Sequence, residues 1–333
     1  MLTPKLQKFV LNDGDILLAM TGATAGKVGK VRTKRPILLN QRVAKIAPVE
    51  ADHGFIWSVV SSQEYQEKFF YLADGAAQPN MSGGQIEGLE IPCPPLPVQR
   101  RIAGILSAYD ELMENSQRRI RLLEAMARAL YREWFVHFRF PGHETHPRVA
   151  SPRGDIPQGW EVRKLDQLAE IKGGKQLEKE DIHEVGEFPV FGGNGIQGYS
   201  EKSTHQGFVI AFGRVGAYCG SIHWSYGGAW LNNNSSSVVP LKHDELVLHH
   251  LLDFNFTNLR GGAAQPFISN TALAGIELVF PGDSLAEKFC SLVKPLRLQQ
   301  VTLERQIQNL RRTRDLLLPR LLSGQVNLGE NNG

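Results

Sequence analysis

The segment 22–27, Gly-Ala-Thr-Ala-Gly-Lys, is the part of the chain that comes nearest to a known nucleotide-binding motif. A phosphate-binding loop needs a glycine, four further residues, Gly-Lys and then Ser or Thr. Here three residues separate the two glycines, and Val28 follows Lys27. The motif fails on spacing, so no nucleotide site is predicted.

Two glycine clusters, Gly173-Gly174 and the run from Gly192 to Gly195, could in principle line a cofactor site. They lack the Gly-x-Gly-x-x-Gly spacing and the following acidic residue of a dinucleotide-binding fold, and tight turns explain them better. The chain also has no Asn/Asp-Pro-Pro-Tyr/Phe run, with which an amino-methyltransferase holds its target base.

No set of ionisable residues has the spacing of a nuclease or a metal site. The acids between Glu178 and Asp181 do not form an Asp…Glu-x-Lys arrangement, and a solvated charged turn explains them better. The histidines between His137 and His146 have no cysteine or paired carboxylate at ligand spacing. The chain is therefore predicted to be a binding component and not an enzyme, with no metal and no cofactor of its own.

Composition indicates a weakly basic cytoplasmic protein. Lys and Arg number 37 against 34 Asp and Glu, for a net charge of +3, which permits a nucleic-acid partner without requiring one. The three cysteines form no Cys-x-x-Cys pair, no apolar run is long enough to span a membrane, and the first residues lack the apolar core of a signal peptide. No membrane partner is predicted.

An internal repeat is the most informative feature of the sequence. Gly-Ala-Ala-Gln-Pro occurs at 75–79 and again at 262–266, an offset of 187 residues. At this offset no gap is needed from residue 75 to about residue 135. A repeated pentapeptide in a long ungapped register indicates duplication.

The match continues upstream with small gaps. Gly-Asp-Ile-Leu at 14–17 resembles Gly-Phe-Val-Ile at 207–210. Residues 156–206 of the second copy have no counterpart before Met1. The first copy is therefore expected to begin in mid-domain.

Each copy is predicted to contain an α/β (α+β) globule. Segments 55–70 and 245–256 have helical spacing. Short apolar runs alternate with Gly-, Asn- and Asp-rich turns, which is typical of short strands. The predicted strands are 16–20, 43–46, 208–212 and 237–240.

A long helix is predicted after each globule, because apolar residues recur at every third and fourth position, as in a coiled-coil seam. Pro295 is expected to kink the second helix. The two helices are expected to pair as an antiparallel coiled coil; the alternative is that each lies on its own globule. The predicted interface residues are Ile102, Leu106, Tyr109, Met113, Ile120, Leu123 and Leu130 in the first helix, and Leu303, Ile307, Leu310, Leu317 and Leu321 in the second.

Loops in both copies contain the residue types that recognise duplex DNA. Lys and Arg neutralise phosphates, Arg suits guanine edges, and Asn and Gln suit adenine edges. The run 27–35 holds five cations and no acid, which fits a phosphate-contacting edge. For any single residue, an exposed loop position without contact is the competing interpretation. The candidate DNA-binding residues are Thr24, Lys27, Lys30, Arg32, Lys34, Arg42, Lys172, Lys175, Gln176, Asn194, Gln197, Tyr199, Arg214, Tyr218 and Asn233.

Three motifs carry a family resemblance. They are Gly-Asp-Ile-Leu followed by Thr-Gly-Ala-Thr-Ala-Gly-Lys-Val at 21–28, Pro-Pro-Leu-Pro-Val-Gln-Arg-Arg-Ile at 94–102, and Leu-Leu-Ser-Gly-Gln-Val at 321–326. With the tandem arrangement, the chain resembles the specificity subunit of Type I restriction–modification systems over nearly its whole length. It departs from that pattern in the first domain, which lacks the part corresponding to 156–206 and is expected to be N-terminally truncated.

The resemblance implies that each target-recognition domain reads one half of a split double-stranded DNA sequence. The paired helices would act as a spacer ruler and dock modification (methyltransferase) subunits, and a restriction (translocase/nuclease) subunit would complete the complex. Methyl transfer from S-adenosylmethionine and ATP-driven translocation would belong to those partners, in agreement with the missing catalytic motifs. The alternative is a degenerate or half-type subunit, a structural partner in which only the second domain reads DNA.

The predicted organisation has six parts. They are a partial first target-recognition domain at 1–97, a first spacer helix at 98–138, a linker at 139–155, a second target-recognition domain at 156–283, a second spacer helix at 284–325 and a tail at 326–333.

Overall fold

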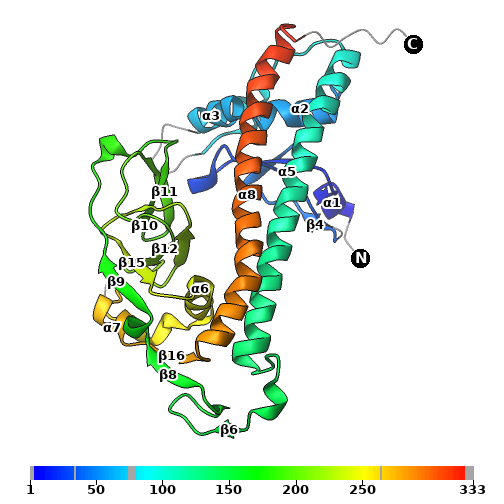
Figure 1. The fold of residues 1–333 in the computed structure, drawn as a ribbon. Coiled ribbons are helices and arrows are strands. Elements are labelled where there is room, and N and C mark those ends of the chain that lie inside the picture. Colours follow the sequence, from blue (N-terminus) through cyan, green and yellow to red (C-terminus); the bar gives the residue numbers. More distant parts are fainter. Residues whose placement is uncertain (1–3, 34, 74–79, 263–264, 327–333) are drawn as a thin grey trace. The chain divides into compact units, whose positions relative to one another are not determined.

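The computed structural model describes residues 4–33, 35–73, 80–262 and 265–326. The chain forms two compact units. Unit 1 comprises Met1–Ile120 with Val301–Gly333, and unit 2 comprises Arg121–Gln300. The long helices α5 (Leu96–Tyr131) and α8 (Asp283–Leu322) each contribute to both units (Figure 1). Within the described residues, no helix is both long and apolar enough to cross a membrane.

Unit 1 is built on a three-stranded antiparallel sheet of order β3-β2-β5, with a second, two-stranded pair β1-β4. The helices α2 and α3 cover the segment that was predicted to be helical, and they are two because Ser62 interrupts it: its hydroxyl accepts from the Tyr65 amide and caps α3. The elements are α1 (Pro4–Gln7), β1 (Val10–Leu11), β2 (Ile16–Ala19), η1 (Gly22–Thr24), β3 (Val28–Lys30), β4 (Ile37–Leu38), β5 (Val43–Ile46), α2 (His53–Val60), α3 (Gln63–Leu72) and α4 (Gly83–Glu87).

Unit 2 contains a four-stranded antiparallel sheet of order β13-β12-β15-β9 and a three-stranded sheet of order β11-β10-β14, in which β10 and β14 are parallel. A small apolar cluster of Phe191, Val209, Ala211, Ala229 and Leu231 joins strands of the two sheets. The strands are β8 (Glu161–Lys164), β9 (Ala169–Gly173), β10 (Phe188–Gly192), β11 (Gly195–Ser200), β12 (Val209–Gly213), β13 (Ile222–Ser225), β14 (Trp230–Leu231), β15 (Ser235–Pro240) and β16 (Glu277–Phe280), and the helices are α6 (Asp244–Asp253) and α7 (Asn270–Ala274).

The segment 139–155, predicted as a linker, carries structure of its own. Its strand β6 (Arg148–Val149) pairs with β7 (Ile156–Pro157). Phe140 is buried, with its ring centroid 5.1 Å from that of Trp160. Aromatic burial of this kind fastens the segment to the start of the second globule.

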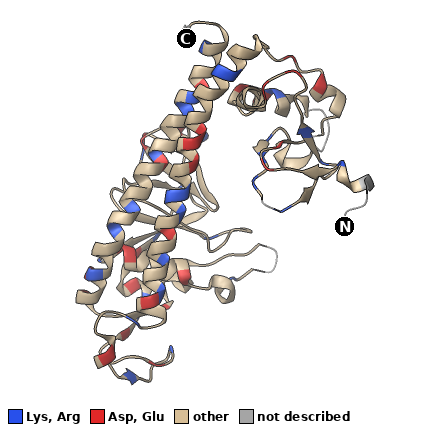
Figure 2. Ribbon diagram, turned by 90° about the vertical axis from the view of Figure 1, so that its right-hand side faces the viewer, with Lys and Arg blue, Asp and Glu red and all other residues tan. Residues whose placement is uncertain are grey.

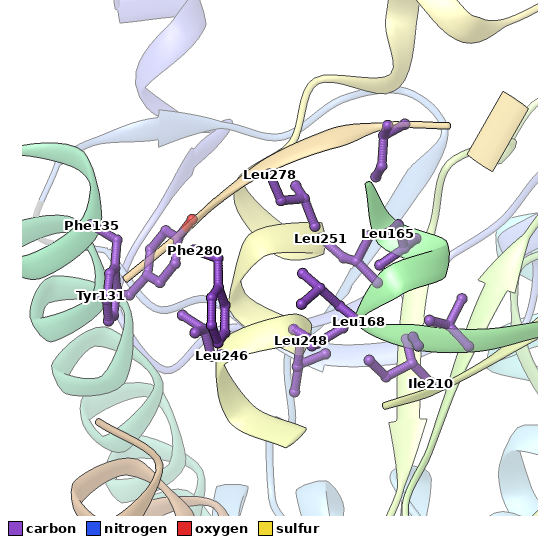
Figure 3. Packing of buried hydrophobic residues seen from close by; sticks show 14 of the residues in the cluster. Tyr131, Phe135, Leu165, Leu168, Ile210, Leu246, Leu248, Leu251, Leu278 and Phe280 are labelled. Carbon is purple, nitrogen blue, oxygen red and sulfur yellow. The ribbon is translucent and has the colours of Figure 1, made fainter. Parts of the chain in front are cut away.

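Helix α6 lies at the centre of the main core of unit 2. Its leucines Leu246, Leu248 and Leu251 lie among Leu165, Leu168 and other apolar side chains (Figure 3). The same cluster includes residues from the end of α5 and the start of α8. The globule and the helices of unit 2 therefore share one core.

The helix seams also serve two purposes in unit 1. Ile102 and Leu106, near the start of α5, belong to one buried cluster with Ile16 and Phe55 of the globule and with Leu321 near the end of α8. The start of α5 therefore packs against the end of α8, and the two helices are antiparallel within the unit, as predicted. The alternative in which each helix lies on its own globule also describes the structure, because the seam residues do both.

Burial follows the predicted seam positions. No predicted seam residue is fully exposed, and α8 continues without interruption through Pro295. The buried positions are Ile102, Leu106, Met113, Leu303, Ile307 and Leu321, and the half-buried positions are Tyr109, Ile120, Leu123, Leu130, Leu310 and Leu317.

The sequence repeat extends to the details of the backbone. Ser82 and Ser269, at the offset of 187, each cap a five-residue helix by accepting from the amide three residues on. The helices end at Gly88 and Gly275, again at that offset, and α5 and α8 begin at equivalent positions. The two units therefore share one framework, as the duplication predicts.

A buried polar cluster joins α6 to α8 in unit 2. Glu245 forms an ion pair with Arg297 (Nε–Oε2 3.5 Å), and Arg297 approaches His249 Nε2 at 3.2 Å. His250 lies 2.9 Å from the Tyr131 hydroxyl. Burial raises the pKa of Glu245 to about 7 and lowers the pKa of His249 to about 3 and that of His250 to about 4.

These shifts predict that acid destabilises unit 2. Between pH 6.5 and 4.5 the unfolded chain protonates both histidines while the folded chain keeps them neutral, so stability falls as the pH falls. Over the same window Glu245 carries a proton in the folded chain but not in the unfolded chain. This proton offsets one of the two that the unfolded chain binds at His249 and His250. Glu245→Gln should therefore steepen the fall about twofold. Urea unfolding at several pH values, followed by hydrogen exchange in α6, measures the slope; equal slopes in both proteins would refute the assignment.

Packing at the seam predicts a contrast between two leucine-sized residues on α5. Ile102→Ala should lower the free energy of unfolding by about 2–5 kcal/mol, because Ile102 is fully buried between globule and helix. The matched control Leu112→Ala removes a side chain that is 55% exposed and should change it by no more than about 0.5 kcal/mol. Chemical denaturation measures both, and similar losses would argue against this seam.

Candidate DNA-binding surfaces

The loops that hold most of the candidate residues of unit 2 converge at one end of its sheets. We define the unit 2 loop rim as residues 173–177, 192–197, 213–221 and 232–234. Because β12 is antiparallel to β13 and β15, and β15 to β9, the end of β12 lies beside the starts of β13 and β15 and the end of β9. Strand order therefore gathers the loops of this sheet, and the Ser221 hydroxyl, which donates to the Gly193 carbonyl (2.9 Å), joins the segment 192–197 to them.

Close backbone contacts hold the unit 2 loop rim together. The Lys175 amide donates to the Leu231 carbonyl (2.8 Å), and the Arg214 amide donates to the Asn234 carbonyl (3.1 Å). A Cβ atom at Gly174 would come within 2.1 Å of the Asn232 carbonyl oxygen. The glycines were predicted to form tight turns. Gly193 lies in the turn between β10 and β11, and Gly195, with φ +101°, begins β11 directly after it. Gly174 instead permits the close approach of two segments of the chain.

Side chains at this rim are positioned by neighbours. Gln197 accepts a hydrogen bond from the buried Asn232 side chain through its Oε1 (3.0 Å). The Arg214 guanidinium lies 5.0 Å from the Phe267 ring centroid. Because these contacts restrict rotamers, Gln197 and Arg214 are presented with reduced freedom.

Seven candidate residues belong to the unit 2 loop rim and two do not. Lys172 lies in β9 and pairs with Glu170 (2.6 Å), and Tyr199 lies towards the other end of β11, opposite Pro189. The residues at the rim are Lys175, Gln176, Asn194, Gln197, Arg214, Tyr218 and Asn233.

Unit 1 presents an equivalent rim, which we define as residues 20–27 and 40–42. The Met20 amide donates to the Arg42 carbonyl (2.9 Å), as the Arg214 amide does to Asn234 in unit 2. Thr24, Lys27 and Arg42 are exposed here. Packing explains why residue 26 is glycine, since a Cβ atom there would lie 2.9 Å from the Phe70 amide nitrogen.

Two candidate DNA-binding residues of unit 1, Lys30 and Arg32, lie away from its rim. The Lys30 ammonium lies over the Trp57 ring (4.5 Å to the centroid), and burial lowers its pKa although Asp110 opposes that shift. Arg32 pairs with Glu114 of α5 (3.1 Å). Lys34 lies outside the described residues. Sequence reasoning read the run 27–35 as one basic edge, and it missed that β3 turns its end towards the helix.

The long helices do not offer an unbroken basic surface. Figure 2 shows Lys and Arg interspersed with Asp and Glu along them. Phosphate binding is strongest where cations gather without acids. The rims, rather than the helix faces, are therefore the candidate DNA-binding surfaces.

One residue beside the unit 2 loop rim, His223 of β13, was missed by sequence reasoning. His223 is half-buried, stacks on Phe191 (6.1 Å between centroids) and would lie 3.1 Å from a Cβ at Gly195. Burial lowers its pKa. Only the strand pairing brings it to the rim, so no local sequence signal could have identified it.

The profile of the Type I restriction modification DNA specificity domain matches residues 2–125 and 157–310. The chain belongs to this family. The two matched segments correspond to the two repeats, and the resemblance stated from the motifs is confirmed.

Relatives of the family agree with this assignment. The Type I restriction enzyme MjaIX specificity subunit of Methanocaldococcus jannaschii is 24% identical over 322 residues, covering 89% of this chain and 74% of the relative. The EcoprrI specificity subunit of Escherichia coli is 24% identical over 282 residues, covering 80% of this chain and 67% of the relative. These relatives are named specificity subunits, in line with the expectation of a non-catalytic component.

A solved structure has the same fold. The crystal structure of the Type I restriction-modification S subunit from M. genitalium aligns with a TM-score of 0.57 at 20% identity, covering 96% of this chain and 91% of that chain. The likeness confirms the mixed α/β globules with long helices.

The close approach at Gly174 generates a prediction. Gly174→Ala should shift the loop rim and lower the free energy of unfolding by about 1–3 kcal/mol, because the added methyl overlaps the backbone at Asn232. Gly227→Ala is the control, since a Cβ at Gly227 meets nothing within 4 Å. Thermal unfolding and hydrogen exchange at 173–177 report the change; equal behaviour of the two variants would contradict the described packing.

Proposed function

We propose that the chain is the DNA-recognition subunit of a Type I restriction–modification complex and reads a bipartite target with its two loop rims. The observation that carries this is the repetition of one framework that places exposed polar loops at equivalent strand ends. The chemistry differs between the rims: Thr24, Lys27 and Arg42 in one, and Arg214 and Asn233 in the other. Different side chains on one framework suit two half-sites of different sequence.

The helix pair would serve as the spacer and the docking platform. Its seam fixes α5 against α8 within each unit, and the exposed residues of both helices include both charges (Figure 2). Such faces suit specific contacts with modification subunits better than binding to phosphates. Methyl transfer, cleavage and translocation are assigned to the partner subunits in this proposal, and the complex would act in the cytoplasm.

The rims can be tested separately in the complex with its modification subunit. Arg214→Ala should relax or lose recognition at one half-site only, with a cost of about 1–3 kcal/mol, or roughly 5- to 150-fold in binding. Lys27→Ala should weaken binding more evenly across sequences and reduce the salt slope by about one. Methylome sequencing and salt-dependent binding to duplexes with each half-site varied measure these effects.

Lys164→Ala is a matched control, since Lys164 is exposed in β8 and lies outside the loop rim. Two separately altered half-sites would support bipartite reading. Loss confined to variants of unit 2 would instead favour the degenerate subunit. Methylation with no split motif dependent on this chain would overturn the proposed function.

A further inference from the structure

Asp110 of α5 and Arg297 of α8 occupy equivalent positions of the repeat, at the offset of 187, but carry opposite charges. Neither is a solvated helix residue. The Asp110 side chain is 25% exposed and that of Arg297 is 4% exposed. Each makes side-chain contacts where its helix meets its own globule.

In unit 1, four side chains gather at this position. Trp57 of α2 donates from Nε1 to Asp110 Oδ2 (2.7 Å). The Lys30 ammonium, from β3, lies over the Trp57 ring, 4.5 Å from its centroid. Arg314 of α8 donates to the other carboxylate oxygen of Asp110 (2.7 Å). We call Lys30, Trp57 and Asp110 the unit 1 latch.

In unit 2, three side chains of the same types meet. The Arg297 guanidinium lies 4.7 Å from the Trp224 ring centroid. Glu245 of α6 forms an ion pair with Arg297 (3.5 Å) and accepts a hydrogen bond from the Tyr226 hydroxyl. We call Trp224, Glu245 and Arg297 the unit 2 latch.

The two latches use equivalent elements. Lys30 and Trp224 correspond by strand register, since Lys30 pairs with Ile16 and Trp224 with Ile210; this register differs by one residue from the sequence match of 14–17 with 207–210. The surrounding hydrogen bonds agree: the Ala19 amide donates to the Lys27 carbonyl, and the Gly213 amide to that of Ser221. Each latch is thus built from a strand, the first globule helix after the sheet, and the long helix.

The chemical roles are permuted over these elements. In unit 1 the strand supplies the cation over the ring, the globule helix the tryptophan and α5 the acid, which Arg314 of α8 also binds. In unit 2 the strand supplies the tryptophan, the globule helix the acid and the long helix the cation. Both arrangements bring a cation, an aromatic ring and a carboxylate together, which is favourable in a partly desolvated site.

We propose that the permuted latches determine which globule seats on which long helix. If the globules exchanged helices, the cations Lys30 and Arg297 would face each other, and Glu245 would face Asp110 in place of the cation with which it pairs. Like charges forced together away from water cost far more than the same charges at an exposed surface. The device discriminates through repulsion in the wrong pairing as well as attraction in the right one. It fixes the order of the two globules along the chain's helices, whatever DNA sequence each one reads.

The test replaces Asp110 of the unit 1 latch with arginine, the charge that Arg297 carries at the equivalent position of unit 2. In the full-length protein, Asp110→Arg should lower the unfolding midpoint more than the neutral Asp110→Asn, by about 2–4 °C or more. Lys30→Met should lower the midpoint in the wild-type background and raise it in the Asp110→Arg background, because it then removes a repulsion. Thermal unfolding and hydrogen exchange in α2 are the measurements.

A matched control separates charge pairing from general packing. Lys27→Met removes an exposed lysine from the neighbouring turn and should show no change of sign between backgrounds. If Asp110→Arg does not fold, the Asp110→Asn background gives the same test, since Lys30→Met should then cost less than in wild type. The proposal is overturned if Lys30→Met costs the same in every background, or if Asp110→Arg is no worse than Asp110→Asn.

Discussion

Burial of each long helix on two sides is the constraint on which the rest of the structure depends. In unit 1, Ile102 and Leu106 share a single cluster with Phe55 of the globule and Leu321 of the other helix. A side chain that fills both interfaces cannot be repacked for one without disturbing the other. The loop rim is carried on strands packed into the same cluster, so its orientation relative to its own stretch of helix follows from this core.

The two units keep the backbone framework and vary the side chains. Equivalent amides and carbonyls make equivalent hydrogen bonds around Met20 and Arg214, while the residues presented at the rims differ. This division is what a duplicated recognition module needs. Backbone hydrogen bonds are insensitive to most substitutions, and base recognition depends on side chains at loop positions.

The sequence predicted most of this architecture because its signals are local or periodic. The seam from Ile102 to Leu130 follows from helical spacing, and the duplication follows from an ungapped offset. The candidate site is harder to predict from the sequence, because strand order decides which residues lie at the rim. Lys27 and Lys30 are three residues apart in one basic run, yet one lies at the rim and the other over Trp57. No local sequence pattern distinguishes an exposed lysine from one that lies over an aromatic ring of another element, here Trp57 of α2.

Duplication also creates a problem that the latches address. Two identical modules on one chain would be interchangeable, and each globule could pack on either helix with similar energy. Because the shared framework preserves shape, shape cannot provide the distinction, and it must come from chemistry at equivalent positions. Asp110 and Arg297 supply it with one charge each, at positions that are partly buried in unit 1 and buried in unit 2. The two rims have diverged in the side chains that they present. They can read the two halves of a target in a defined order only if each globule always packs on the same long helix.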